Sequence, residues 1–407
     1  MEVFVIISII TILGLAGYGF QIWSIRSALK GTDTDLGKGE AEKSALCIPS
    51  PGVSVLKPLK GLDDNLFDNL ESICNQDYPE YEIIFSLQNY NDPAFKVAEK
   101  IKNKFPNKNI TLLVERCNAG LNPKVNNLIP AYKIARHDYI LISDSNVRVE
   151  KNYLKEIMTH MKDPEVGVVS NIIQGVGARS IGSALENLHL NSFVMGSVCF
   201  LDKFLKMPCV VGKSMLMRKK DIEAIGGFRA VKNVLAEDYI IGKKMQKSGK
   251  KVILSKHIIR NVNEYWGIRR FLNRHTRWGK LRWKIGGAGY FSELFSNAVF
   301  MSSLPLLWEP SRITLAFAAF VSLIKMIGDF YIGRKTKSGM NCLFYLLSPV
   351  KDIIIGLIWF VPLLSNTVTW RGNRYRIGKD SMLLPCPEAG LWSLRYRAMD
   401  AIKARFA

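Results

Sequence analysis

The stretch Tyr139-Ile-Leu-Ile-Ser-Asp-Ser-Asn146 decides the fold of this chain. Its mostly apolar first part, Tyr139–Ser143, predicts a short buried strand, and the carboxylate of Asp144 follows directly. In an open sheet of parallel strands, ligands bind beyond the carboxyl ends of the strands. Asp144 is therefore expected at the edge of the sheet where a binding site forms.

The same pattern recurs upstream, where apolar runs alternate with helical periodicity. Helical stretches are expected near 65–75, 93–104 and 124–135. Three further strands are expected at Val53–Leu56, Glu82–Ser86 and Ile110–Val114. Strand–helix alternation of this kind predicts an α/β fold with one open, parallel sheet.

Composition indicates a soluble domain joined to a few membrane helices. The chain has 407 residues, of which 48% are apolar, and a formal net charge of +21. Such a basic excess suits a polyanion, either a phosphorylated substrate or an acidic lipid surface. No recognition helix, zinc finger or aromatic RNA-binding motif is visible, so we expect no nucleic acid partner. Seven cysteines without a Cys-x-x-Cys pair argue against a disulfide framework or a zinc site.

Apolar segments at both ends predict membrane spans. Val3–Trp23 is uncharged and long enough to cross a bilayer, and we expect a retained anchor because no basic residue precedes it. Near the other end, 313–332 and 345–367 are expected to span, and 291–308 to be interfacial or re-entrant. The predicted parts are a transmembrane anchor (1–24), a linker (25–52), a cytosolic sheet domain (53–290), interfacial and transmembrane helices (291–367) and a basic cytosolic tail (368–407).

Charge sets the expected orientation. Arg26 and Lys30 follow the anchor, so the sheet domain should face the cytosol. The expected setting is a bacterial inner membrane, or the Golgi in a eukaryote. With two C-terminal spans, however, the basic loop 334–337 falls on the opposite side, against the charge rule.

Two acidic positions follow predicted strands. Asp144 can hold Mg²⁺ or Mn²⁺ against donor phosphates, although Asn146 replaces the second Asp of an Asp-x-Asp pattern; the alternative is a turn or helix cap. Asp92 can contact a nucleotide base or ribose, but Asn-Asp-Pro is also a common turn. The pair Asp63-Asp64 is interpreted as solvated loop.

Two further motifs carry candidate donor and acceptor chemistry. Asp238, in Glu237-Asp238, can act as a general base, or the pair can simply stabilise a helix start. In the loop before the third helix, Lys124 can meet phosphate and Asn126 can bond ribose or sugar. The alternative there is a loop followed by a helix start.

The segment Trp266–Lys284 is basic and aromatic. As a helix it places an apolar stripe from Ile268 to Ile285, and it puts Arg274 and Arg277 on one face to bind diphosphate. The alternative is an interfacial helix anchored by Trp and Arg. His275 lacks a partner that would indicate a metal site, and His189 is expected to be buried and satisfied.

Taken in order, these motifs resemble the ceramide glucosyltransferase family. The resemblance rests on Leu56-Lys-Pro-Leu-Lys-Gly61, Gln76-Asp-Tyr-Pro79, Asn122-Pro-Lys-Val-Asn-Asn-Leu128, Asp144-Ser-Asn146, Ala236-Glu-Asp-Tyr239, Arg274-x-x-Arg-Trp278 and Trp370-Arg-Gly-Asn-Arg-Tyr-Arg376. It implies a GT-A fold, a UDP-sugar donor, a divalent cation (Mg or Mn) and inversion at the anomeric carbon.

The resemblance also implies residue roles. Asp92 and Asp144 match the donor and metal aspartates of the family, and Asp238 matches its base. Arg274, Arg277 and Trp278 match its Q/R-x-x-R-W motif. Two departures, Arg274 where animal members commonly have Gln and Asn146 where Gly is commoner, concern acceptor and sugar choice.

The expected function is transfer of glucose from UDP-glucose to ceramide, which gives β-glucosylceramide. Within enzymes, the alternative is transfer of a UDP-sugar to another membrane lipid: a hopanoid, as in a close relative, diacylglycerol or polyprenyl phosphate. Outside enzymes, the alternative is a non-catalytic membrane scaffold that keeps nucleotide binding.

Overall fold

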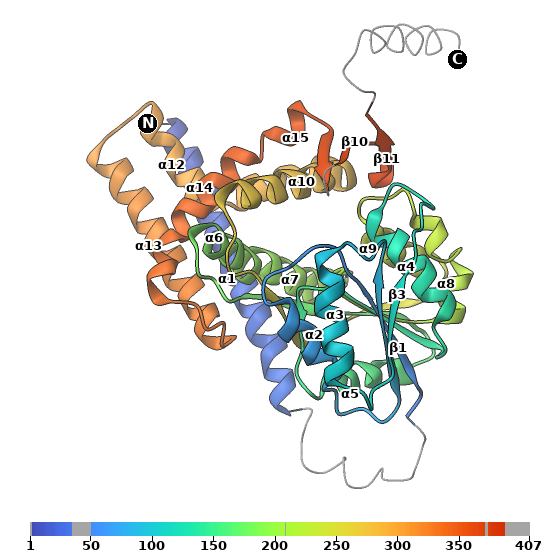
Figure 1. The fold of residues 1–407 in the computed structure, drawn as a ribbon. Helices are drawn as coiled ribbons and strands as arrows, with labels where there is room; N and C mark the ends of the chain where they lie inside the picture. Colours follow the sequence, from blue (N-terminus) through green and yellow to red (C-terminus); the bar gives the residue numbers. More distant parts are fainter. Residues whose placement is uncertain (1, 35–49, 208, 371–372, 387–407) are drawn as a thin grey trace, which may run out of the picture.

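A computed structural model gives the structure of the chain and describes residues 2–34, 50–207, 209–370 and 373–386. An α/β sheet domain stands beside a group of apolar helices, and helix α10 (Ile268–Gly286) lies between the two (Figure 1). The sheet has eight strands in the order β3-β2-β1-β4-β7-β6-β8-β5.

The first four strands are parallel neighbours, as the sequence predicted. They are β1 (Val53–Pro58), β2 (Tyr81–Leu87), β3 (Ile110–Val114) and β4 (Tyr139–Ser143). The predicted bounds of β3 and β4 are confirmed, and β1 and β2 extend slightly beyond theirs. All four carboxyl ends therefore lie at one edge of the sheet.

The second half of the sheet is mixed. Strand β7 (Ser214–Arg218) is antiparallel to β4, and β6 (Val166–Val176) is antiparallel to β7 and parallel to β8 (Lys251–Val262). The short β5 (Val147–Arg148) pairs with β8. Because Ser143 pairs with Ser214, the backbone N–H of Asp144 donates to Lys213 O at 3.2 Å. This antiparallel pairing places a lysine directly beside the strand-end carboxylate.

Helices cover both faces of the sheet, and each face carries its own apolar core. In most of these helices the apolar positions recur every three or four residues, so one side is buried against the strands. The helices of the sheet domain are α2 (Leu66–Cys74), α3 (Pro93–Lys104), α4 (Pro123–Ile134), α5 (Tyr153–Thr159), α6 (Ile181–His189), α7 (Met195–Leu205), α8 (Lys219–Ala224) and α9 (Glu237–Lys247). A π-helical turn, Leu190–Val194, joins α6 to α7.

Three segments of the described chain are long and apolar enough to cross a membrane: Glu2–Lys30, Arg312–Lys335 and Cys342–Leu364. They contain α1 (Glu2–Thr34), α13 (Arg312–Lys335), and α14 (Ser348–Ile358) with α15 (Val361–Leu364). The predicted linker 25–52 is wrong at its start, because α1 continues as helix to Thr34. Residues 35–49 of that linker lie outside the described residues.

Helices α1 and α13 run in the same direction. The ring of Phe4 lies 5.8 Å from that of Phe317, and Tyr18 OH donates to Asp329 Oδ1 at 2.6 Å. The topology expected from charge required opposite directions, so that expectation is wrong. The last turn of α13, with Arg334, instead lies at the same end as Lys30, which is near the end of α1.

The segment expected to be interfacial, 291–308, leads from the end of α10 to the start of α13. It forms α11 (Phe291–Ser296), α12 (Ala298–Ser303) and a short 3₁₀ turn. Helix α12 packs in one apolar cluster with α1 and α13. The segment thus brings the chain to the end of the helix group where α1 begins, and α13 starts at that end.

Part of the predicted basic tail is folded. Strands β9 (Thr367–Trp370), β10 (Asn373–Ile377) and β11 (Leu383–Pro385) form a small antiparallel sheet. Its Val368, Tyr375 and Ile377 pack on Leu235 of the sheet domain. Residues 387–407 lie outside the described residues.

Candidate active site

A cavity of about 820 Å³ opens at the carboxyl ends of β1 and β4, between the sheet, α10 and β9. Seven basic and four acidic side chains line it, so positive charge exceeds negative by three. The basic ones are Lys60, Lys124, Lys213, Arg269, Arg270, Arg274 and Arg277, and the acidic ones are Asp63, Asp144, Glu237 and Asp238. A concave site with this excess attracts a polyanion such as a diphosphate.

Asp144 lies at the centre of the charged groups. Its Oδ1 is 2.9 Å from Lys124 Nζ, and its Oδ2 is 2.9 Å from Lys213 Nζ. Burial alone would raise the pKa of Asp144, but Lys124 and then Lys213 hold that pKa well below its usual range. The carboxylate is therefore ionised and paired on both oxygens.

The divalent cation expected at Asp144 does not fit this arrangement. Asn146 Oδ1 accepts from Lys213 Nζ at 2.8 Å, so the Lys213 ammonium lies between Asn146 and Asp144, the predicted metal ligand. Lys124 likewise bridges Asp144 and Glu237 Oε1, at 3.0 Å from the latter. The described residues contain no group of three or more His, Cys, Asp or Glu side chains suited to a metal. Lysine ammonium groups thus supply the positive charge at this strand end.

Glu237 and Asp238, at the start of α9, have different surroundings and different contacts. Glu237 is buried and accepts from Asn122 Nδ2 at 3.1 Å in addition to its pair with Lys124. Asp238 lines the cavity, and burial and then repulsion from Glu237 raise its pKa above the usual range. The raised pKa suits Asp238 to take up a proton in the cavity.

Backbone groups hold Asp238 in place. Its Oδ2 accepts from Gly212 N and its Oδ1 from Tyr239 N, each at 2.8 Å. A Cβ at Gly212 would lie 2.6 Å from Asp238 Oδ2, so only glycine permits this approach. The loop before β7 therefore positions both Asp238 and Lys213.

Asp92 and Asn126 do not line the cavity, although the sequence placed both at a donor site. Asp92 Oδ1 caps α3 through Ala94 N and also accepts from Gly61 N, both at 2.9 Å. The Asn126 amide bonds the backbone N–H and C=O of Gly120. Both side chains are used to shape loops, because their polar atoms are already paired with backbone.

Asp63 and Asp64, which the sequence analysis dismissed as solvated loop, connect two segments around the cavity. Asp63 accepts from Ser145 Oγ at 2.5 Å and lies 3.7 Å from Arg270 Nη2. Asp64 Oδ2 accepts from Glu264 N at 2.7 Å. The sequence did contain a signal that these two residues belong to the site: they follow β1 closely, and β1 ends at the same sheet edge as Asp144.

Helix α10 brings Arg274, Arg277 and Trp278 to the cavity, as the sequence predicted. The Arg274 guanidinium carbon lies 4.3 Å from the Trp278 ring centre, and that of Arg277 lies 5.8 Å from the Trp370 ring centre. Of the predicted apolar stripe, Phe271 is buried as expected, whereas the prediction is wrong at Ile268, which is 49% exposed at the start of the helix.

A buried carboxylate anchors α10. Glu186 of α6 is fully buried, with Oε1 at 3.2 Å from Arg274 Nη1 and Oε2 at 2.8 Å from His275 Nε2. Burial would raise the pKa of Glu186, but Arg274 and then His275 keep it lowered. Neither Glu186 nor Lys213 was singled out from the sequence, because their partners are distant along the chain.

Comparison with known proteins agrees with this geometry. A family model described as glycosyl transferase family 21 matches residues 6–383. Ceramide glucosyltransferase 1 of Caenorhabditis elegans is 28% identical over 80% of this chain and 72% of its own length. Ceramide glucosyltransferase 3 of the same organism is 26% identical over 82% of this chain and 74% of its own length.

Two solved structures resemble the chain more distantly. A Pyrobaculum calidifontis mannosyltransferase in complex with GDP-Man and Mn²⁺ has 14% identity and a TM-score of 0.44, over 87% of this chain and 99% of that chain. TarS 1–349 of S. aureus in complex with UDP-GlcNAc has 13% identity and a TM-score of 0.39, over 83% and 100%.

The predicted fold class is confirmed: a GT-A type α/β sheet with one N-terminal and two C-terminal apolar helices. The family match spans the sheet, α10 and the apolar helices, and it includes every residue that lines the charged cavity. This chain belongs to glycosyl transferase family 21 and is a glycosyltransferase similar to ceramide glucosyltransferases.

Proposed function

We propose that the enzyme transfers glucose from UDP-glucose to the hydroxyl of ceramide or a similar membrane lipid alcohol. The observation that supports this most directly is Asp238, a carboxylate with raised proton affinity in a cavity of net positive charge. The apolar helices beside that cavity suit an acceptor dissolved in the membrane.

In this proposal the basic side chains of the cavity bind the diphosphate. Arg274 and Arg277 offer planar forks that stay charged and match pairs of phosphate oxygens. Lys213 and Lys124 supply charge at the end of β4. These groups stabilise the negative charge that develops on UDP as it leaves, which is where electrostatic catalysis acts.

Asp238 is the proposed general base. The acceptor oxygen attacks the anomeric carbon as the bond to the phosphate oxygen breaks, and UDP leaves with that electron pair. The proton of the acceptor hydroxyl moves to Asp238. A single displacement of this kind inverts the anomeric centre and gives a β-glycoside.

The divalent cation expected from the family resemblance has no step in this mechanism, because lysines hold Asp144 and Asn146. A cation bound elsewhere on the donor would add positive charge to the diphosphate. The arrangement of Asp144 is compatible with transfer that relies on side-chain charge alone.

The overall assignment is tested with purified protein, a panel of UDP-sugars and a panel of lipids. Products are identified by mass spectrometry. We expect glucosylceramide or a related glucosyl lipid from UDP-glucose. Transfer only to a hopanoid or diacylglycerol, or only from another UDP-sugar, would replace the named substrates, and absence of any transfer would contradict the proposal.

We also propose that the sheet domain, 53–290, faces the cytosol. Lys30 near the end of α1 and Arg334 in the last turn of α13 lie at the same end of two parallel helices, and basic residues favour the cytosolic side. Protease added to sealed, right-side-out vesicles should spare this domain. Its digestion from outside would reverse the orientation.

Asp238→Asn should lower transfer far more than UDP binding, because it removes the base. Its amide oxygen can still accept from one of the two backbone N–H groups that hold Asp238. The expected loss is at least about 10²-fold. With the parent protein, kcat should rise with pH through the raised pKa of Asp238, above the usual aspartate value of about 3.9, since only the ionised form accepts the proton. An Asn variant that turns over at the parental rate would rule out this base.

Arg277→Lys should lower kcat although it conserves charge, because a lysine cannot form two parallel bonds to a diphosphate. Arg260→Lys is the matched control, since Arg260 pairs with Glu150 away from the cavity. Steady-state kinetics and a membrane flotation assay measure the two properties. Full kcat in Arg277→Lys, or release of that variant from membranes, would favour a purely interfacial role for the motif.

Chelation of divalent cations should leave UDP binding intact, because Lys213 occupies the position between Asp144 and Asn146. Lys213→Ser should weaken UDP binding by about tenfold, the size of one charge-assisted hydrogen bond, and should make binding respond to Mn²⁺. Calorimetry with UDP, with and without Mn²⁺, measures this, with exposed Lys220→Ser as control. Loss of UDP binding by the parent protein in chelator would contradict the arrangement.

A further inference from the structure

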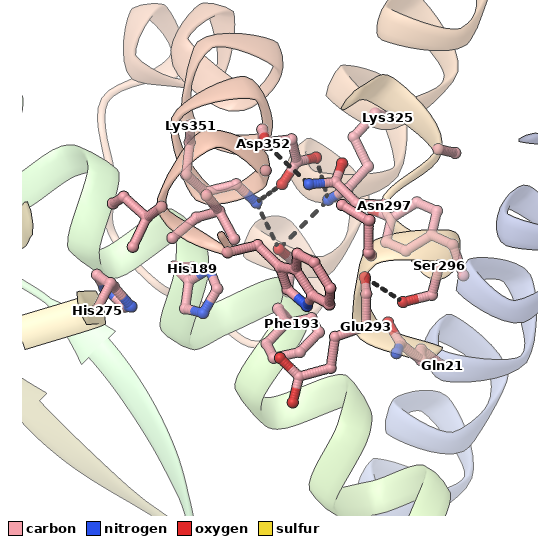
Figure 2. A pocket seen from close by; sticks show the side chains of 18 of the residues that line it. Gln21, His189, Phe193, His275, Glu293, Ser296, Asn297, Lys325, Lys351 and Asp352 are labelled. Atoms are coloured by element: carbon pink, nitrogen blue, oxygen red, sulfur yellow. Dashed lines mark hydrogen bonds and ion pairs between the residues drawn. The ribbon is translucent and has the colours of Figure 1, made fainter. Parts of the chain in front are cut away.

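A small cavity, of about 60 Å³, lies among the apolar helices on the other side of α10, and its charges cancel. Figure 2 shows the side chains around it: His189, His275, Lys325, Lys351 and Asp352. Lys325 Nζ is 2.6 Å from Asp329 Oδ1. Lys351 Nζ is 2.8 Å from Asp352 Oδ1. His189 is 1% exposed, and neither ring nitrogen has a hydrogen-bond partner among the described residues. The space suits a few water molecules and offers no net attraction for a charged ligand.

A larger hollow, of about 710 Å³, is strongly basic. It lies between the last turns of α1, the end of α7 and the start of β8, and we call it the lysine groove. Of the described residues that line it, five are lysines and one is acidic: Lys203, Lys206, Lys250, Lys251, Lys256 and Asp202. Its volume is in the range of ligand-binding clefts, and its excess of positive charge attracts an anion.

The two ends of the lysine groove differ in how their charges are paired. Lys250 and Lys251, near the start of β8, form ion pairs with acidic side chains of the sheet domain. At the other end, Lys203 lies over an aromatic ring. Lys206 forms the C-cap of α7 near Asp202, whose pKa is raised by burial. The two lysines of α7 thus outnumber their acidic neighbour, and the excess of positive charge is at this end.

The α7 end of the groove lies where α1 would leave the membrane. As a helix, the uncharged run Val3–Trp23 is about 30 Å long, which matches the hydrocarbon core of a bilayer. Ser24, Ser27 and Ala28 line the groove and follow this run within about 8 Å along the helix axis. Because the headgroup layer on each side is about 5–8 Å thick, this end of the groove lies at the depth of lipid phosphates.

Aromatic side chains mark the same level. Phe20 and Trp23 of α1 are half-exposed, and the ring centre of Phe204 on α7 lies 5.9 and 5.1 Å from theirs. Lys203 Nζ lies 4.0 Å from the centre of the Trp23 ring. Tryptophan is enriched at membrane–water interfaces, where lysine extends its charge toward the headgroups. The aromatic rings and the length of the apolar run therefore indicate the same membrane surface.

An occupant of the lysine groove would touch α1 and the sheet domain together. Ile25 of α1, Cys199 of α7 and Leu254 of β8 belong to one buried apolar cluster. Cys199 and Leu254 also line the groove, next to the turn of α1 that contains Ser24 and Ser27. A ligand that binds only the folded protein stabilises it, so occupancy should strengthen the joint between α1 and the sheet domain.

We propose that the lysine groove binds the phosphate of an anionic glycerophospholipid at the membrane surface, through Lys203 and Lys206. A phosphatidylcholine would bring its own cation to the same lysines, so net charge favours a lipid such as phosphatidylglycerol. The described residues that line this groove are all different from those that line the charged cavity. The inference goes beyond the proposed function, because it depends on neither the sugar donor nor the acceptor.

Lipid retention tests the preference on the full-length protein. The protein is reconstituted in nanodiscs with equal amounts of phosphatidylcholine and phosphatidylglycerol, and the lipids that stay bound after release are identified by native mass spectrometry. We expect phosphatidylglycerol to be enriched by about fivefold for each lysine that contacts it, the usual effect of one basic residue at an anionic surface. Equal retention of the two lipids by the parent protein would overturn the proposal.

Variants locate the bound lipid. The double variant Lys203→Gln with Lys206→Gln should lose most of the enrichment, and the matching pair of Arg substitutions should keep it. The control is Lys100→Gln with Lys102→Gln, which removes the same charge from exposed positions of α3. Undiminished enrichment in the Gln pair at 203 and 206, or an equal loss in the α3 control, would show attraction by overall charge and would overturn the site.

Thermal unfolding separates a lipid from a free anion. In phosphatidylcholine nanodiscs, added phosphatidylglycerol should raise the unfolding temperature of the parent protein by about 2 °C, and inorganic phosphate should not. The Gln pair should unfold at the parental temperature without phosphatidylglycerol and should show no rise with it. A rise with inorganic phosphate alone, or an equal rise with phosphatidylglycerol in the Gln pair, would contradict a lipid site at these lysines.

Discussion

The ion pairs between Asp144 and the ammonium groups of Lys124 and Lys213 are the interaction on which the site depends. They join the end of β4, the start of α4 and the loop before β7, which come together only in the folded sheet. An ionised, buried carboxylate requires such partners, since its desolvation would otherwise be prohibitive. The pairing also fixes the next loop residue, Gly212, against Asp238. The two lysines and Asp238, the proposed base, are thus positioned by one set of contacts.

Helix α10 is the second organising element, because it separates two cavities of different character. Its Arg274 and Arg277 face a large space of net positive charge, whereas His275 faces a small, balanced one among apolar helices. Glu186 holds Arg274 and His275 at once. One buried carboxylate therefore fixes side chains on both sides of the helix.

Because α1 and α13 run in the same direction, polar side chains of the two helices meet inside the group of apolar helices. Tyr18 of α1 donates to Asp329 of α13, and Lys325 lies over the Tyr18 ring at 4.3 Å. Because these polar groups satisfy one another between helices, they are tolerated within apolar segments. The same arrangement brings the basic ends of both helices, with Lys30 and Arg334, to one end of the group of apolar helices.

The sequence by itself determined the local elements: strands at Ile110–Val114 and Tyr139–Ser143, the apolar helices, and the cavity positions of Lys124, Asp144, Asp238, Arg274, Arg277 and Trp278. Periodicity and strand ends depend on neighbouring residues, so they can be recognised in the sequence. Only the tertiary structure decided the roles of Lys213, Asp63 and Glu186, the backbone tasks of Asp92 and Asn126, and the unpartnered state of His189. Each depends on contacts between residues far apart in the sequence, and no local pattern encodes which strands or helices become neighbours.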